Sequence, residues 1–301
     1  TIKGFSDFIN KEDPDLIVVH GDRTEALAGA LVGCYNNILV AHFEGGEVSG
    51  ALDDSLRHAI SKLSNIHFVT DQKSKKRLTQ LGEQPNFIFV IGSPDIDLMK
   101  SKNLEDIDTV KSYYEINFNE YAVAIFHPVT TELDNLESDI ENFCRAMIAS
   151  RKNYVVIYPN NDEGSEIVLS AYKKFLTSDN FRVFPSLRFE YFLTVIKSSS
   201  FVIGNSSMGI REAPFYNIPT INIGTRQKNR VSIESVINTS YSETSILKAI
   251  NGIDEAPSNK TVNTFEFGEG DSYKKFIHVL EGSEIWNSSN QKTFLDIEFD
   301  E

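Results

Sequence analysis

The feature that most constrains the fold of this chain is the alternation of short apolar runs with longer stretches of helical periodicity. The apolar runs are rich in Val, Ile and Phe and end at turn or polar residues, as buried strands do. Strands that alternate with helices build βαβ units with a parallel sheet, so we expect an α/β protein. The predicted strands are residues 15–21, 37–44, 66–70, 87–92, 121–127, 153–159, 181–185, 200–204 and 218–224. The predicted helices are residues 24–35, 53–63, 72–81, 132–150, 163–176 and 188–198.

The length of the chain and one polar segment indicate two domains. With 301 residues, of which 41% are hydrophobic, the chain is long enough to build two compact cores. A charged, weakly periodic segment at residues 93–120 predicts the junction between them. We therefore expect two doubly wound Rossmann-like domains, an N-terminal one at residues 1–100 and a C-terminal UDP-binding one at residues 101–283. The polar, acidic residues 284–301 are expected to form a surface tail.

The charge and the cysteine content restrict the partners and the compartment. A formal net charge of -14 argues against a general nucleic-acid-binding protein, which carries positive charge to neutralise phosphates. Cys34 and Cys144 lie far apart without metal-ligand spacing, which favours a reducing compartment. No apolar run reaches membrane-spanning length, and residues 1–15 lack the pattern of a signal peptide. We expect a cytoplasmic protein that binds neither nucleic acid nor membranes.

Polar side chains follow the predicted strands at the edge where parallel sheets bind ligands. In such folds the ligand lies outside the carboxyl ends of the strands. Because both halves of the chain have polar strand ends, we expect the ligand in a cleft between the two domains. The residues at these strand ends are Asp22, Arg23, Glu44, His127, Asn160, Asp162, Asn205, Ser206 and Ser207.

The stretch GNSSMGIREAP at residues 204–214 predicts a site for a phosphate group. Ser206 and Ser207 are expected to cap a helix whose free N–H groups face an anion, although an ordinary serine cap is the structural alternative. Glu212 on the next turn suits ribose hydroxyls, and Arg226 suits a diphosphate. The chain has neither GxGxxG nor a Walker sequence, so the pattern gives no argument for NAD or ATP.

A second cluster of charged residues lies in the stretch AHFEGGEVSGALDDSLRHAISKL at residues 41–63. Asp53 and Arg57 are four residues apart and share one face of the predicted helix. Asp22 and Glu44 end strands that we expect to be neighbours. Carboxylates in one site perturb each other's pKa and supply acid and base groups. A structural role, at a helix end or in solvent, is expected for Asp54, Glu47 and His58.

Five motifs together resemble the hydrolysing UDP-N-acetylglucosamine 2-epimerases of sialic-acid-type sugar synthesis. They follow one another in the order and spacing of that family. The motifs are GDR at 21–23, HFEGGEVSGALDDSLRHAISKL at 42–63, HPVTTE at 127–132, GNSSMGIREAP at 204–214 and GTRQ at 224–227. The resemblance implies a fold of the glycosyltransferase-B type, a UDP-sugar substrate, no cofactor or metal, and a homodimer or homotetramer.

The chemistry implied by this resemblance is an elimination followed by hydration. A base takes the proton from C2 of the sugar while UDP leaves C1. Water then adds, and C2 is protonated from the other face to give the free 2-epimer. The expected catalytic residues are Asp22, Glu44, Asp53 and His127. The expected substrate and UDP-binding residues are Arg23, Arg57, Asn160, Ser206, Ser207, Glu212 and Arg226.

Three other functions stay open on the sequence. They are a non-hydrolysing epimerase that retains UDP, a transferase on the same fold, and a catalytically silent UDP-sugar-binding protein. The substrate is open between UDP-N-acetylglucosamine and UDP-2,4-diacetamido-2,4,6-trideoxyglucose, because residues 158–166 and 185–196 look closer to bacterial members of the family. Family members begin with a further strand and a glycine-containing loop. We therefore expect a truncated N-terminal domain that lacks roughly 70 to 80 residues.

Overall fold

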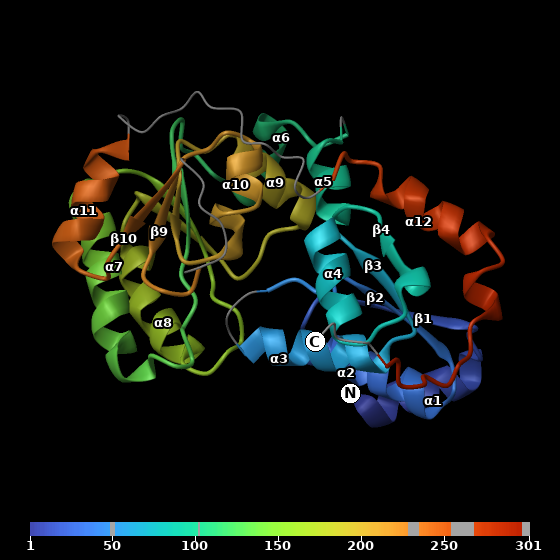
Figure 1. Cartoon of the computed structure of the whole chain (residues 1–301). Coiled ribbons are helices and arrows are strands. Elements are labelled where there is room, and N and C mark those ends of the chain that lie inside the picture. Colours follow the sequence, from blue (N-terminus) through green and yellow to red (C-terminus); the bar gives the residue numbers. More distant parts are fainter. Residues whose placement is uncertain (49–51, 102, 228–234, 254–267, 297–301) are drawn as a thin grey trace, which may run out of the picture. The chain divides into compact units, whose positions relative to one another are not determined.

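The computed structural model describes residues 1–48, 52–101, 103–227, 235–253 and 268–296 of the chain (Figure 1). The chain forms two compact units. Unit 1 comprises Thr1–Lys100 and Asn263–Glu301, and unit 2 comprises Ser101–Val262. Each unit contains one parallel β-sheet with helices packed against it, so the predicted α/β class with two Rossmann-like domains is confirmed. Within the described ranges, every helix is too short or too polar to span a membrane.

Unit 1 has a four-stranded sheet in the order β1-β2-β3-β4, in which every neighbouring pair is parallel. The strands are β1 (Leu16–His20), β2 (Leu39–Phe43), β3 (Ile66–Val69) and β4 (Ile88–Val90). The helices are α1 (Ile2–Glu12), α2 (Thr24–Tyr35), α3 (Leu52–Leu63), α4 (Gln72–Gln80), α5 (Pro94–Met99) and α12 (Ser272–Glu281). The described residues of this unit also contain the 3-10 turns η1 (Pro85–Phe87) and η7 (Ile285–Asn287).

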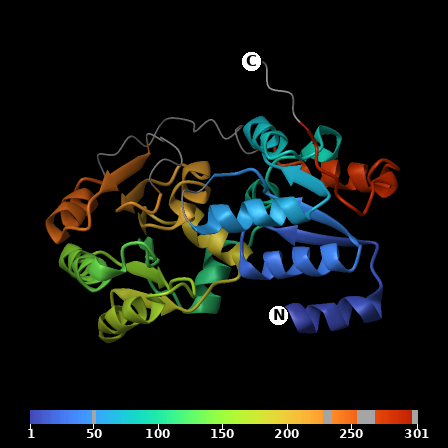
Figure 2. The same ribbon diagram turned by 60° about the horizontal axis from the view of Figure 1, so that its bottom comes forward.

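The two faces of this sheet are covered by helices from different ends of the chain. Right-handed crossovers that add strands in one direction place their helices on one face. Accordingly, α1, α2 and α3 pack in one cluster with Ile17 and Val40 of the sheet. On the other face, the Phe276 ring of α12 lies 5.1 Å from the ring of Phe43 and 4.9 Å from that of Phe68. Figure 2 shows the dark blue α1 beside α2, away from the red α12.

The position of α12 differs from the predicted domain boundary. The C-terminal domain was expected to span residues 101–283, but the described residues 268–283 belong to unit 1. The physical reason is that the crossover helices leave one apolar sheet face open, and Phe276, Val279 and Leu280 of α12 pack there. A local hydrophobic pattern does not show which distant sheet a helix covers.

The predicted surface tail is bound to unit 1 over its described part, residues 284–296. Ile285 is fully buried in the cluster beneath α12. Lys292 pairs with the buried carboxylate of Glu83 and donates to the Ser64 carbonyl at 2.6 Å. Burial acts to raise the pKa of Glu83, but the hydrogen bond and charge interaction with His67, followed by those with Lys292, hold it down to about 2. The tail is therefore anchored to the N-terminal unit and does not lie free in solvent.

Phe276→Ala should lower the free energy of unfolding, because it removes the ring that closes the second face of the sheet. We expect a loss on the order of 2–4 kcal/mol, measured by urea denaturation. Ile277, the next residue of α12, is 47% exposed and provides the matched control. Ile277→Ala should cost less than about 0.5 kcal/mol. Equal losses for the two variants would contradict the packing of α12 on the sheet.

Unit 2 has a six-stranded parallel sheet in the order β10-β9-β8-β5-β6-β7. The strands are β5 (Ala122–Ile125), β6 (Tyr154–Ile157), β7 (Phe181–Phe184), β8 (Val202–Gly204), β9 (Thr220–Ile223) and β10 (Val236–Thr239). The helices are α6 (Ile107–Tyr114), α7 (Leu136–Ser150), α8 (Ser165–Tyr172), α9 (Phe189–Lys197), α10 (Glu212–Phe215) and α11 (Glu243–Asn251). The 3-10 turns are η2 (Leu133–Asn135), η3 (Lys173–Thr177) and η4 (Ser207–Gly209).

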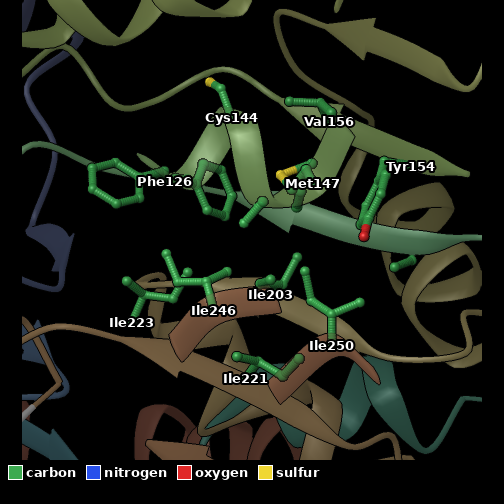
Figure 3. Close-up of a cluster of buried hydrophobic side chains, with 14 of the residues drawn as sticks. Phe126, Cys144, Met147, Tyr154, Val156, Ile203, Ile221, Ile223, Ile246 and Ile250 are labelled. Carbon is green, nitrogen blue, oxygen red and sulfur yellow. The ribbon is translucent and has the colours of Figure 1, made fainter. Parts of the chain in front are cut away.

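The strand order of unit 2 makes the sheet doubly wound and defines a switch point. From β5 the chain moves outward to β6 and β7, and it then returns to β8 on the other side of β5. The larger core cluster lies on one face, where Met147 of α7 and Ile246 and Ile250 of α11 pack with the strand residues Ile203 and Ile221 (Figure 3). In a doubly wound sheet the switch point is where ligands bind, here between the ends of β5 and β8.

Candidate active site

Arg57 is a buried arginine with several polar contacts at the carboxyl edge of the unit 1 sheet. It is 5% exposed, and its guanidinium group pairs with Asp22, in the turn after β1. Nη1 lies 3.3 Å from a carboxylate oxygen of Asp54 and donates to the Glu47 carbonyl at 3.1 Å. Because a buried charge is tolerated only when it is paired, these contacts fix Arg57 beside Asp22. Arg57 and Asp22 therefore lie together, as predicted.

The carboxylate of α3 that pairs with Arg57 is not that of Asp53. Asp53 and Arg57, four residues apart, were expected to share one face of this helix, but the carboxylate that pairs with Arg57 is that of Asp54, three residues earlier. Within the described part of the chain, no ion pair joins Asp53 to Arg57. The two spacings place a side chain on nearly the same helix face, so the sequence could not separate them. Arg23, the other predicted arginine, precedes α2 and is exposed.

Glu44 occupies a buried and conformationally unusual position after β2. It is 7% exposed, and its backbone has φ 62°, in the left-handed region that residues other than glycine rarely adopt. Such a conformation costs on the order of 1 kcal/mol or more and persists only where surrounding contacts fix it. One carboxylate oxygen accepts a hydrogen bond from Ser93 at 3.3 Å, and the other lies 3.4 Å from Nε2 of His20. The sequence had singled out neither Ser93 nor His20.

His42 supports the turn that carries Asp22. Its ring is buried, with Nε2 donating to the Gly21 carbonyl at 2.8 Å and Nδ1 accepting from the Ser61 hydroxyl at 3.0 Å. Burial lowers the pKa of His42 to about 3, although the hydrogen bond to Gly21 acts in the opposite direction. The ring is therefore neutral near pH 7 and fixes the backbone immediately before Asp22.

The loop after Glu44 is held by two further side chains. Arg77 of α4 donates to the Gly46 carbonyl at 3.1 Å. Thr70, which follows β3, donates to the Glu47 carboxylate at 2.9 Å. Glu47 is thus held by a hydrogen bond from the neighbouring strand end. Together these bonds keep the glycine-containing loop in one conformation next to the carboxylates.

In unit 2, Asn205 joins the two strand ends at the switch point. Its fully buried amide accepts from the His127 N–H at 2.7 Å and donates to the His127 carbonyl at 2.8 Å. The preceding Gly204 has φ 136°, and a Cβ there would lie 1.8 Å from the Ile125 carbonyl oxygen. Only glycine allows β8 to approach β5 this closely. The predicted residue His127 is thus positioned by its neighbour across the switch point.

A hydrogen bond from Asn160 selects one tautomer of the neutral His127 ring. Nδ1 of His127 accepts a hydrogen bond from the Asn160 backbone N–H at 3.0 Å. A ring nitrogen that accepts carries no proton, so the neutral ring carries its proton on Nε2. His127 can therefore serve as a hydrogen-bond donor to an anion through Nε2.

Three further hydrogen bonds join the GTRQ segment to these loops. The Asn205 carbonyl accepts from Arg226 at 3.2 Å and from Gln227 at 2.8 Å. Thr225 donates at 2.6 Å to Glu132, the last residue of the HPVTTE segment. The loops after β5, β6, β8 and β9 thus form one hydrogen-bonded group that contains the predicted residues His127, Asn160 and Arg226.

The prediction that a helix begins at Ser206 and Ser207 is wrong, because these residues cap and begin a short 3-10 turn. Ser206 caps the 3-10 turn η4 with its side chain, and the α-helix α10 begins only at Glu212 and spans four residues. Gly209 and Pro214 in this segment disfavour a longer regular helix. Glu212 is 8% exposed, and Ser206 and Ser207 are half-buried. The chain here offers hydroxyl groups and backbone N–H groups but not the dipole of a long helix.

Asn205→Ala should destabilise unit 2 by about 1–3 kcal/mol, because the His127 N–H and carbonyl would be left without their buried partner. Thermal unfolding of the variant against wild type measures the effect. Asn119→Ala provides the control, since the Asn119 side chain is exposed. If both variants unfold at the wild-type temperature, the amide of Asn205 does not hold the switch point together.

Comparison with known proteins gives the family of this chain. The sequence profile of the family described as UDP-N-acetylglucosamine 2-epimerase matches residues 1–281. The chain belongs to this family. It is 45% identical over 298 residues to the UDP-N-acetylglucosamine 2-epimerase of Neisseria meningitidis serogroup B, covering 99% of this chain and 79% of that protein.

Two further family members are similar in sequence or in fold. The UDP-N,N'-diacetylbacillosamine 2-epimerase (hydrolyzing) of Legionella pneumophila is 31% identical over 292 residues, covering 95% of this chain and 77% of that protein. A crystal structure of UDP-GlcNAc 2-epimerase from Neisseria meningitidis bound to UDP-GlcNAc superposes with a TM-score of 0.75 at 22% identity, covering 93% of this chain and 79% of that one. The predicted fold of the glycosyltransferase-B type is therefore confirmed.

Proposed function

We propose that this member of the 2-epimerase family hydrolyses a UDP-2-acetamido sugar and releases UDP and the free 2-epimer. The observation that carries the proposal is the carboxyl edge of the unit 1 sheet. There a buried glutamate, Glu44, is held in a left-handed backbone conformation, and the Asp22 carboxylate is paired with the buried Arg57. Carboxylates fixed in this way suit acid–base chemistry on a sugar ring.

The reaction divides into an elimination and a hydration. In the elimination a carboxylate removes the C2 proton, the bond between C1 and the UDP oxygen breaks, and a C1=C2 double bond forms. In the hydration a carboxylate takes a proton from water as the water oxygen bonds to C1, and a carboxylic acid gives its proton to C2 from the opposite face. We assign these proton transfers to Asp22, Glu44 and Asp53, and neither step needs an electron acceptor.

The loops at the unit 2 switch point are assigned to UDP. Because Nδ1 accepts from Asn160, the neutral His127 ring carries its proton on Nε2, and Arg226 supplies a positive charge in the same hydrogen-bonded group. Both suit the diphosphate, because charge-assisted hydrogen bonds to phosphate oxygens are among the stronger ones in proteins. We assign the uridine to the neighbouring Ser206, Ser207 and Glu212, with Asn160 supporting His127.

Two facts support the hydrolysing reaction over one that retains UDP. The loop after β2 has the EGGEVSG form of the hydrolysing branch that the sequence resembles. The name of the Legionella pneumophila relative includes the hydrolysing activity. The name of the Neisseria meningitidis relative does not specify the fate of UDP.

The test is proton NMR in D₂O of the protein with UDP-N-acetylglucosamine, and in a second tube with UDP-2,4-diacetamido-2,4,6-trideoxyglucose. We expect free UDP and a 2-epimer deuterated at C2, and the tube in which they appear identifies the substrate. An epimerised sugar still bound to UDP would instead establish a non-hydrolysing epimerase. An unchanged nucleotide sugar in both tubes would overturn the proposed reaction and leave a binding protein or a transferase.

A further inference from the structure

The two carboxylate oxygens of Glu44 have different surroundings. Oε1 lies 3.3 Å from the hydroxyl of Ser93, which follows β4 and is 2% exposed. Oε2 lies 3.4 Å from Nε2 of His20, at the end of β1, whose side chain is 50% exposed. One oxygen thus faces a buried hydroxyl, and the other faces a ring that reaches solvent.

The direction of the hydrogen bond from Ser93 follows from its second contact. The hydroxyl oxygen of Ser93 accepts a hydrogen bond from the Asp95 N–H at 3.3 Å, as the cap of α5. A hydroxyl has one hydrogen and two lone pairs, so the lone pair used by Asp95 leaves the hydrogen for Glu44. A carboxylate can only accept, which gives the same direction for the Ser93–Glu44 bond.

The Ser93 hydroxyl restricts the orientation of the Glu44 carboxylate, which the backbone alone does not fix. The backbone of Glu44 is already in the left-handed region, and its N–H donates to the Phe68 carbonyl at 3.0 Å. The side chain nevertheless has several rotatable bonds, so the backbone alone does not fix the carboxylate. The bond from Ser93 removes this freedom, because a hydrogen bond to an ionised oxygen is short-range and directional.

We propose that Ser93 is a positioning residue for Glu44, holding Oε1 so that Oε2 is the oxygen that takes up and returns the proton. The proposal rests on the proposed function, in which Glu44 acts on the sugar. Glu44 remains the group that meets the substrate, and Ser93 acts only through it. The serine therefore affects the rate of the reaction and not the affinity for UDP.

The experiment compares wild type, Ser93→Ala and Ser93→Thr in the release of UDP under substrate saturation. Ser93→Ala should lower kcat by roughly 10- to 100-fold, the value of one hydrogen bond to a charged group, with KM and the Kd for UDP unchanged. Ser93→Thr keeps the hydroxyl and should restore most of the rate. Asp106→Ala removes the cap of α6 in unit 2 and controls for the loss of a helix cap.

A double-mutant cycle separates positioning from a general loss of structure. In the Glu44→Gln background, Ser93→Ala should cause no further loss, because the group that it positions is no longer a carboxylate. Independent, multiplicative losses would overturn the proposal, as would an unchanged kcat for Ser93→Ala in an active enzyme. A wild-type protein that releases no UDP from either nucleotide sugar would overturn the proposed function and this proposal together.

Discussion

Glu44→Gln is expected to reduce kcat by roughly 10²–10⁴-fold, the usual contribution of one acid–base group. The amide keeps the size of the side chain and can still accept a hydrogen bond from Ser93, so the fold should not change. The Kd for UDP should equal that of wild type, since UDP is assigned to unit 2. Steady-state kinetics and calorimetric titration with UDP measure the two quantities.

Two sets of controls accompany this prediction. Glu12→Gln alters an exposed carboxylate at the end of α1 and should leave both quantities unchanged. Ser207→Ala and Glu212→Ala should show the opposite pattern, with weaker UDP binding and a smaller effect on kcat. If all three site variants lost UDP affinity to the same degree, the assignment of chemistry to unit 1 and of UDP to unit 2 would have to be abandoned.

Acid should destabilise the protein through His42. The pKa of its buried ring is lowered to about 3, against an ordinary value of 6.5, chiefly because burial disfavours the charged form. As the pH falls below 6.5, His42 becomes protonated in the unfolded chain but stays neutral in the folded chain. The contribution of His42 to the free energy of unfolding is thus fully present above pH 6.5 and is lost as the pH falls towards 3. At about pH 4 the loss amounts to about 3 kcal/mol.

The contribution of His42 is measurable against a variant that cannot titrate. Urea denaturation of wild type and of His42→Gln at neutral pH and at about pH 4 gives the difference in acid sensitivity. His42→Gln should be less stable at neutral pH but should lose about 3 kcal/mol less on acidification. His278→Gln is the control, because His278 is exposed on α12. Identical acid sensitivity of His42→Gln and wild type would show that His42 titrates normally in the fold.

The local structure of the fold was predictable, but its long-range packing was not. Each predicted strand is present, because a buried parallel strand is a continuous apolar run that ends in polar or turn residues. By contrast, β10, α11 and α12 lie in stretches where no element was predicted. Whether an amphipathic segment such as α12 packs at all depends on a sheet face formed far away in the sequence, which no local pattern reports.

The candidate site was predictable where its residues stand at strand ends. Asp22, Glu44 and His127 directly follow predicted strands, and this position made them candidates for the site. The residues that the sequence missed are supporting ones. His20 and Ser93 look like ordinary strand and cap residues, and their relation to Glu44 exists only through the register of the sheet.

The packing of α12 on the sheet of unit 1 means that this sheet face is completed well after its strands are made. The face that carries Phe43 and Phe68 is made early, whereas Phe276 leaves the ribosome only after all of unit 2 has been synthesised. At roughly 5–20 residues per second, this delay is on the order of ten seconds or more. During that time the nascent sheet presents an apolar surface to its surroundings, of the kind that chaperones bind. The helix α12 thus completes a sheet whose strands are made before unit 2, so unit 1 reaches its native core only after unit 2 has been synthesised.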